Sequence, residues 1–303
     1  MATQEIMTFV QFQKEFNNDE ACYKHLFQKK WENGFECHKC KHTHAYETKT
    51  RKLPLYECAQ CHHQTSVTAG TIFEKTRTSL YLWFSAIYLV SHDKRGVSAI
   101  LLSRELKVTY KTAWLMLHKI RKAMADRDAP YKLDGIVELD DFFIGAPTEN
   151  GKRGRGTDKN QVLIAVSKNK KGHPLHVKME VISDMKGPTV LDFTTRFIEK
   201  GSHLKTDAHR SFLDLANKGY SLDARKLDLG KDPNHLKWIH TTISNLKAFV
   251  LGTFHGLDSR HLQAYLDEFC YRYNRRNFVG QLFNRVLKSC VSTCTITHNE
   301  LRV

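Results

Sequence analysis

Four cysteines near the N-terminus limit the fold of this 303-residue chain more than any other feature. Cys37 and Cys40 are separated by two residues, as are Cys58 and Cys61, and seventeen residues lie between the two pairs. This spacing predicts a ribbon whose two knuckles hold one zinc ion between four thiolates. Because four cysteines leave no coordination position open, we expect a structural zinc rather than a catalytic one. The ribbon and the segment before it should form a first domain, residues 1–72.

The charge of the chain favours a polyanionic partner. Lysine and arginine (47) outnumber aspartate and glutamate (32), which gives a formal net charge of +15. Such an excess favours nucleic acid through counterion release, although it carries no sequence specificity. No stretch approaches the ~20 consecutive apolar residues that cross a bilayer, and the first residues lack the pattern of a signal peptide. We therefore expect a cytoplasmic, nucleoid-associated protein that binds no membrane.

Residues 73–127 are predicted to form a helical DNA-binding domain. Two helices over 99–106 and 111–123 are separated by a tight connection. Ser98 and Thr109 stand where each helix should begin, and both residue types are good N-caps. The arrangement is that of a helix-turn-helix.

A helix-turn-helix indicates which side chains would touch DNA, because the second helix presents its first residues to base edges. Tyr110, Lys111 and Thr112 occupy the start of the second helix, and Arg104 of the first helix is placed to reach phosphate. The alternative is a helical pair that only builds a core.

The pattern changes to strands after residue 128. Three runs rich in β-branched and aromatic residues predict three consecutive antiparallel strands, over 135–145, 161–169 and 175–183. A helix, a short strand over 202–207 and a largely helical last third follow. We expect an α/β catalytic domain over 128–303, with a mixed sheet flanked by helices.

Two aspartates are candidates for metal binding. Asp140 lies within an otherwise apolar strand, where a carboxylate is costly unless it binds metal or a partner, and Asp207 ends the short strand. Phosphoryl transfer on DNA commonly uses such carboxylates to hold divalent metal. Alternatively, Asp207 caps the following helix and Asp140 faces solvent on an edge strand. Successive strand residues face opposite sides, so only one of Asp140 and Asp141 can face a site, and the sequence leaves open which.

An ordered series of sequence blocks makes the chain resemble a known family. After the two cysteine pairs it contains, in order, the blocks QTSVTAGTIF (64–73), LSRELKVTYKTAWLMLH (102–118), VELDDFFIG (137–145), TDAHRSF (206–212), LGTFHG (251–256) and HLQAYLDEFCYRYNRR (261–276). This series resembles bacterial insertion-sequence transposases that pair a zinc ribbon with an ISXO-like, DDE-type transposase domain. The resemblance implies an RNase H-like catalytic domain. It also implies binding to terminal inverted repeats, strand cleavage and transfer with Mg²⁺ or Mn²⁺, and a homodimer or larger synaptic assembly on double-stranded DNA.

The resemblance also assigns catalytic residues. Asp140 and Asp207 match the first two acids of the family, and the third position, seven residues before a basic residue, falls on His240 with Lys247 after it. Many relatives carry glutamate where His240 stands. Either the imidazole completes the metal site, which would suit Mn²⁺ better than Mg²⁺, or the amide of Asn245 does. Helical spacing places His240 and Lys247 on one face and Asn245 elsewhere, which favours His240.

Lys247 would then hold a phosphate as a point charge.

Lys152, Arg153 and Arg155 form a basic loop between the first two strands, which either clamps a DNA backbone or is a solvated turn. Cys290 has a metal-like spacing from later residues, but we expect it to lie in a loose tail and attribute the spacing to chance.

The main alternative function is a catalytically decayed relative that acts as a sequence-specific DNA-binding protein. In that case the histidine at position 240 marks the loss of activity. A nuclease without strand transfer is a third possibility.

Overall fold

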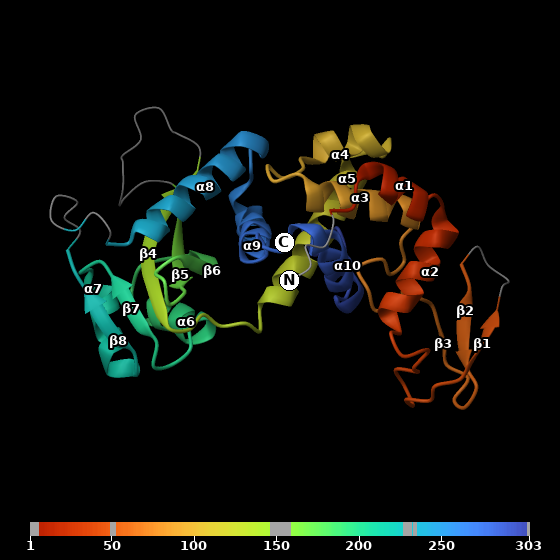
Figure 1. Ribbon diagram of the computed structural model, residues 1–303, viewed down its shortest axis with the longest axis horizontal. Helices are drawn as coiled ribbons and strands as arrows, with labels where there is room; N and C mark the ends of the chain where they lie inside the picture. Colours follow the sequence, from red (N-terminus) through yellow and green to blue (C-terminus); the bar gives the residue numbers. More distant parts are fainter. Residues whose placement is uncertain (1–5, 49–52, 146–158, 227–231, 233–234, 302–303) are drawn as a thin grey trace. The chain divides into compact units, whose positions relative to one another are not determined.

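The computed structural model describes residues 6–48, 53–145, 159–226, 232 and 235–301 (Figure 1). The chain divides into two compact units. The first contains residues 1–127 and 278–303, and the second contains residues 128–277. Within the described ranges, no helix is both long enough and apolar enough to cross a membrane.

The first unit combines a small three-stranded sheet with helices before and after it in the chain. In chain order it contains α1 (Phe9–Glu15), α2 (Asp19–Lys30), β1 (Ala45–Thr48), β2 (Leu55–Cys58), β3 (Gln64–Thr65), α3 (Leu80–His92), α4 (Ala99–Leu106), α5 (Tyr110–Asp128), the 3₁₀ turn η3 (Val279–Gln281) and α10 (Leu282–Ser292). The three strands pair antiparallel in the order β1-β2-β3. The two helices expected after the ribbon are confirmed as α4 and α5. Ser98 accepts a hydrogen bond from the Leu101 amide, and Thr109 accepts one from the Thr112 amide.

The C-terminal helix α10 belongs to the first unit, whereas the sequence placed it with the catalytic domain and predicted a loose tail. Phe283, Val286, Leu287 and Cys290 are all buried and follow helical spacing, so α10 has an apolar face that requires a partner. Phe283 lies in an aromatic cluster with Phe12, Phe16, Phe84 and Tyr88. The expectation of a loose tail was therefore wrong.

The backbone of Ile72 connects three parts of the first unit. Its N–H donates to the carbonyl of Cys290 at 3.1 Å, and its carbonyl accepts from the buried Lys119 ammonium at 3.2 Å. The Thr295 hydroxyl also donates to this carbonyl, at 3.3 Å. The link between ribbon and helices is thus fixed both by α5 and by the C-terminal segment.

The second unit is built on one five-stranded sheet. It contains β4 (Ile136–Ile144), β5 (Asn160–Lys168), β6 (Pro174–Ile182), α6 (Gly187–Phe197), β7 (His203–Thr206), α7 (Arg210–Leu213), η1 (Asp214–Lys218), β8 (Ser221–Ala224), α8 (Lys237–Thr253), η2 (Ser259–His261) and α9 (Leu262–Asn274). The strand order is β6-β5-β4-β7-β8. Strand β5 runs antiparallel to both of its neighbours, β4 and β6, whereas β7 runs parallel to β4 and β8 runs parallel to β7. This mixed sheet, with helices on its faces, confirms the expected α/β architecture of a mixed sheet flanked by helices.

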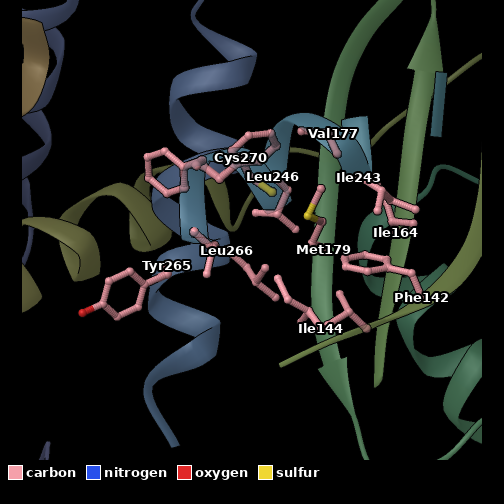
Figure 2. Close-up of a cluster of buried hydrophobic side chains, with 14 of the residues drawn as sticks. Phe142, Ile144, Ile164, Val177, Met179, Ile243, Leu246, Tyr265, Leu266 and Cys270 are labelled. Atoms are coloured by element: carbon pink, nitrogen blue, oxygen red, sulfur yellow. The ribbon is translucent and has the colours of Figure 1, made fainter. Parts of the chain in front are cut away.

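Strand β4 is central and contributes to a core on each face of the sheet. Val137 and Leu139 belong to the core beneath α6. Phe142 and Ile144 belong to the opposite core, where Ile164 and Met179 of the sheet meet Ile243, Leu246 and Leu266 of α8 and α9 (Figure 2). The side chains of a strand alternate between the faces, so both faces of β4 are covered.

The outer edge of β6 is covered by α9 rather than left open. The side-chain amide of Gln263 accepts from the Val181 N–H and donates to the Met179 carbonyl. Asn274 does the same for the N–H and carbonyl of Val177. Two side chains of one helix therefore satisfy backbone groups that would otherwise offer an edge for pairing.

Replacing Phe283 with alanine should destabilise the first unit. A fully packed phenylalanine typically contributes about 3–5 kcal/mol, and Phe283 is 3% exposed. Denaturant unfolding can be followed by fluorescence, since three of the four tryptophans, Trp31, Trp83 and Trp114, lie in this unit. Asn284→Ala, at an exposed position of the same helix, should change stability by less than about 0.5 kcal/mol. Equal effects of the two changes would contradict the packing described for α10.

Candidate functional site

The four cysteines of the ribbon come together as the spacing predicts. The Sγ atoms of Cys37 and Cys61 are 3.6 Å apart, and those of Cys40 and Cys58 are 3.5 Å apart. All four sulfur atoms lie within 4.8 Å of one another. A tetrahedral site with Zn–S bonds of about 2.3 Å requires sulfur atoms about 3.8 Å apart. The arrangement fits a structural zinc.

The two knuckles have the same backbone geometry. In each, the residue after the second cysteine has a left-handed conformation, with φ of 63° at Lys41 and 57° at His62. The N–H of Lys41 donates to the Cys37 carbonyl at 2.8 Å, and that of His62 to the Cys58 carbonyl at 3.0 Å. Left-handed residues other than glycine cost free energy and are kept where the surroundings demand them. Here the tight turn brings both cysteines of each pair to one point.

The four thiols ionise unequally: the pKa of Cys58 is lowered, whereas the pKa of Cys40, against the effect of the His42 backbone N–H, is raised to about 12 by burial and the neighbouring thiols. At Cys58, burial acts against ionisation, but the backbone N–H groups of Cys61 and Gln60 and the neighbouring thiols outweigh it. Together they lower the pKa of Cys58 to about 6.

The two candidate aspartates lie at neighbouring positions of two adjacent parallel strands, Asp140 within β4 and Asp207 directly after the end of β7. Leu139 of β4 is paired in register with Thr206 of β7. Asp140 and Asp207 are the next residue on each chain, and strands in a sheet lie about 4.8 Å apart. The fold thus places the backbones of two acidic residues, 67 positions apart in the sequence (207 minus 140), next to each other.

The sheet also decides which of the two consecutive aspartates faces α8. Asp140 is paired with Ile164, which belongs to the core beneath α8. Asp141 is paired with Leu163, which belongs to the core beneath α6, and its carboxylate accepts a hydrogen bond from Gln161 at 2.6 Å. Because β4 is central, Asp140 is not the solvent-facing residue of an edge strand.

Local hydrogen bonds of Asp207 differ from those of a helix cap. One carboxylate oxygen accepts the N–H of His209 at 3.0 Å, but helix α7 begins at Arg210 and its N-cap is His209. Asp207 therefore stabilises the turn that leaves β7 without capping the helix.

Helix α8 presents His240, Ser244 and Lys247 as exposed residues of one face. Trp238 shows which side of α8 faces the turn between β5 and β6. Its indole N–H donates to the carbonyl of Gly172 in that turn at 2.7 Å. Asn245 is seven residues after Trp238 and shares its side of the helix. His240 lies on the other side, away from this turn. The geometry favours His240 over Asn245 as the third member of a site at β4 and β7.

Asp140, Asp207 and His240 do not have their ligand atoms gathered within the range of a single metal ion. Across the described part of the chain, the ribbon cysteines form the only group of three or more histidine, cysteine, aspartate or glutamate residues whose ligand atoms lie within 4.8 Å. Asp140, Asp207 and His240 form no such group, and their assignment stays a prediction.

The candidate DNA-binding residues occupy different surroundings. Arg104, Tyr110 and Lys111 are exposed, and Tyr110 is 55% accessible. Thr112 is half-buried, and its hydroxyl is hydrogen-bonded to that of Thr109 at 2.9 Å. Lys152, Arg153 and Arg155 lie outside the described residues.

Comparison with known proteins gives two family matches. Residues 132–274 match the ISXO2-like transposase domain, and residues 17–64 match the transposase zinc-ribbon domain. A protein described as an uncharacterized protein in transposable element ISH50 of Halobacterium salinarum is 29% identical over 147 residues. That match covers 48% of this chain and 47% of the relative, so the chain spans about half the length of the relative.

Among solved structures, the Mos1 strand transfer complex matches with 9% identity and a TM-score of 0.30 over 71% of this chain and 79% of the other. The Mos1 transposase paired-end complex with the left transposon end matches with 9% identity and a TM-score of 0.24, over 70% and 79% of the two chains.

Zinc content should depend on the ribbon cysteines alone. Cys58→Ser removes one of four thiolates, so the purified protein should lose most of its zinc, which elemental analysis measures directly. Cys294 is exposed and lies outside the four-cysteine group, so Cys294→Ser should keep one zinc per chain. Full zinc content in Cys58→Ser would be incompatible with a four-thiolate site.

Proposed function

This chain belongs to the transposases that join a zinc ribbon to an ISXO2-like transposase domain, and we propose that it binds the ends of its insertion sequence and cuts and rejoins DNA there. The observation that carries the proposal is the register of β4 and β7, which sets Asp140 beside Asp207. Two acidic residues at neighbouring positions on a basic protein suit phosphodiester chemistry.

The proposed active site consists of Asp140, Asp207, His240 and Lys247. The two carboxylates and the imidazole would hold Mg²⁺ or Mn²⁺, and the oxygen donors suit either ion. When bound, the metal supplies positive charge at the reacting phosphate and lowers the pKa of the attacking hydroxyl group. Support for His240 comes from its side of α8, opposite the side that Trp238 fixes against the turn after β5.

The proposed reaction is two in-line displacements at phosphorus. In the first, water attacks a phosphodiester at the element's end, the bond from phosphorus to the 3′-oxygen breaks, and that oxygen leaves as a 3′-hydroxyl. In the second, this hydroxyl attacks a phosphodiester of the target, a new phosphorus–oxygen bond forms, and the target's 3′-oxygen leaves. Lys247 is exposed on α8 and would hold a neighbouring phosphate as a point charge throughout.

Recognition of the ends is assigned to the ribbon and the α4–α5 pair. The exposed Tyr110 and Lys111 stand at the start of α5, from which a recognition helix reaches base edges, and Arg104 would bind phosphate. Lys152, Arg153 and Arg155 are proposed to clamp the DNA backbone. Because two element ends must be joined together, we expect a homodimer or a larger assembly on double-stranded DNA.

Active-site substitutions on DNA carrying the element's own ends test the chemistry. Replacing a residue that only orients a metal ligand typically lowers metal affinity or activity about 10–100-fold. Loss of a ligand itself should cost more, so Asp140→Ala, Asp207→Ala and His240→Ala should each reduce the cleavage rate by more than about 100-fold. His240→Glu should retain or increase cleavage with Mg²⁺, because carboxylate is the harder ligand. The measurement is cleavage and strand transfer of labelled DNA with Mg²⁺ or Mn²⁺.

Asn245→Ala is the matched control on α8 and should change cleavage less than about twofold. If Asn245→Ala were inactive while His240→Ala was active, the third ligand would be Asn245. Intact cleavage in Asp140→Ala would rule out the site, and an inert wild type revived by His240→Glu would identify a decayed copy that still binds DNA.

A separate substitution tests the DNA-binding helix. Lys111→Ala should weaken binding to end DNA and reduce the salt dependence of log K by about 1, because one positive charge at the DNA surface is lost and fewer counterions are released on binding. Lys122→Ala, on the same helix, removes a lysine already paired with Asp126 at 2.7 Å and should leave the slope unchanged. Identical slopes for Lys111→Ala and wild type would remove Lys111 from the interface.

A further inference from the structure

Glu138 is a buried carboxylate in the centre of the sheet. It lies on β4, two residues before Asp140 and on the same face, and only 1% of the residue is exposed. A carboxylate at this depth requires hydrogen bonds or a counter-ion. Its partners therefore indicate why the chain keeps an acid here.

Both carboxylate oxygens of Glu138 are occupied. One is 2.9 Å from the Lys168 ammonium, in an ion pair of which both side chains are largely buried. The other accepts the backbone N–H groups of Trp238 at 3.0 Å and Ile239 at 3.1 Å. The carboxylate thus binds protein groups on both sides, and this arrangement is that of an anchor rather than of a metal ligand.

The N–H groups that Glu138 binds are those of the first turn of α8. The first N–H groups of a helix lack partners within the helix, and a side chain just before it usually accepts them. Here the preceding residue, Leu236, has a left-handed backbone (φ 53°) and makes no capping hydrogen bond. Glu138 supplies the missing acceptor from a strand 100 residues away, and its negative charge suits the positive end of the helix.

This anchor connects the two sides of the proposed active site. Asp140 follows Glu138 on the same face of β4, and His240 follows Ile239, one of the residues that Glu138 binds. The Trp238 indole, hydrogen-bonded to Gly172, fixes the rotation of the helix about the same point. A shift of α8 along or away from β4 would therefore move His240 relative to Asp140.

We propose that Glu138 is a positioning residue that holds the start of α8 on β4 and so sets His240 against Asp140, with Lys168 holding the carboxylate in place. The proposal rests on the proposed function for its catalytic consequence. The hydrogen bonds between Glu138 and α8 are independent of that function and can be tested without DNA.

The test uses two double variants of the 303-residue chain that differ only in the acceptor. Glu138→Gln with Lys168→Met removes both charges and keeps an amide oxygen for the helix N–H groups. Glu138→Met with Lys168→Met has nearly the same shape and no acceptor. Replacement of a buried ion pair by well-packed neutral side chains is often tolerated, so both variants should fold. Glu180→Gln, which weakens an ion pair between Glu180 and Arg196 on the edge strand, is the control for loss of a sheet carboxylate.

Hydrogen exchange is the first measurement. In the variant with two methionines, the amides of Trp238 and Ile239 should exchange at least about tenfold faster than in the glutamine variant, while amides of β4 and β5 remain equally protected in both. Equal exchange at Trp238 and Ile239 would overturn the anchoring role.

Metal binding and cleavage form the second measurement. The methionine pair should bind Mn²⁺ about 10–100-fold more weakly than the glutamine pair, the range typical for partners that orient metal ligands. Its cleavage rate at saturating DNA should fall by a similar factor, with the DNA concentration at half-saturation and the zinc content unchanged. Faster exchange combined with undiminished Mn²⁺ affinity would overturn the proposal, as would a cleavage rate equal to that of the glutamine pair.

The outcomes also separate this proposal from the proposed function. A wild-type chain that binds Mn²⁺ but cuts no DNA would refute the function, and weaker Mn²⁺ binding by the methionine pair would still support positioning. A wild-type chain that cuts DNA, alongside two double variants that behave alike, would refute positioning only. A wild-type chain that binds no Mn²⁺ would refute both.

Discussion

The parallel pairing of β4 with β7 is the constraint on which the second unit depends. It sets the central strand between an antiparallel pair on one side and a parallel pair on the other, so both faces of β4 must be buried. It also sets Asp140 beside Asp207. Asp140 is half-buried there, and its carboxylate accepts the Asp141 N–H at 2.8 Å.

Helix α8 completes this region through a polar contact within an apolar interface. Ile239, Ile243 and Leu246 supply burial, which is strong but not directional. The Glu138 carboxylate adds a directional contact. It accepts hydrogen bonds from two adjacent N–H groups of α8, which fixes the position of the start of the helix on β4. The apolar contacts attach the helix to the sheet, and the polar contact sets its register.

Much of the fold was predictable from local patterns. Cysteine spacing predicted the zinc ribbon, and runs of β-branched and aromatic residues predicted β4, β5 and β6 within one residue of their ends. The last helix was missed although Phe283, Val286, Leu287 and Cys290 have helical spacing. Its partners, such as Phe16 and Phe84, lie about 200 residues or more earlier in the chain, and no local pattern relates them.

The sequence by itself determined the chemical types of the site: four thiolates at metal spacing, two aspartates at strand positions, and a histidine and a lysine on one helical face. These follow from residue identity and from the short periods of helices and strands. Tertiary structure alone decided that Asp140 rather than Asp141 faces α8, that Glu138 caps that helix from another element, and that the C-terminal helix returns to the first unit. Each of these depends on which distant segments pair, and that is set by the burial of whole faces rather than by any local spacing.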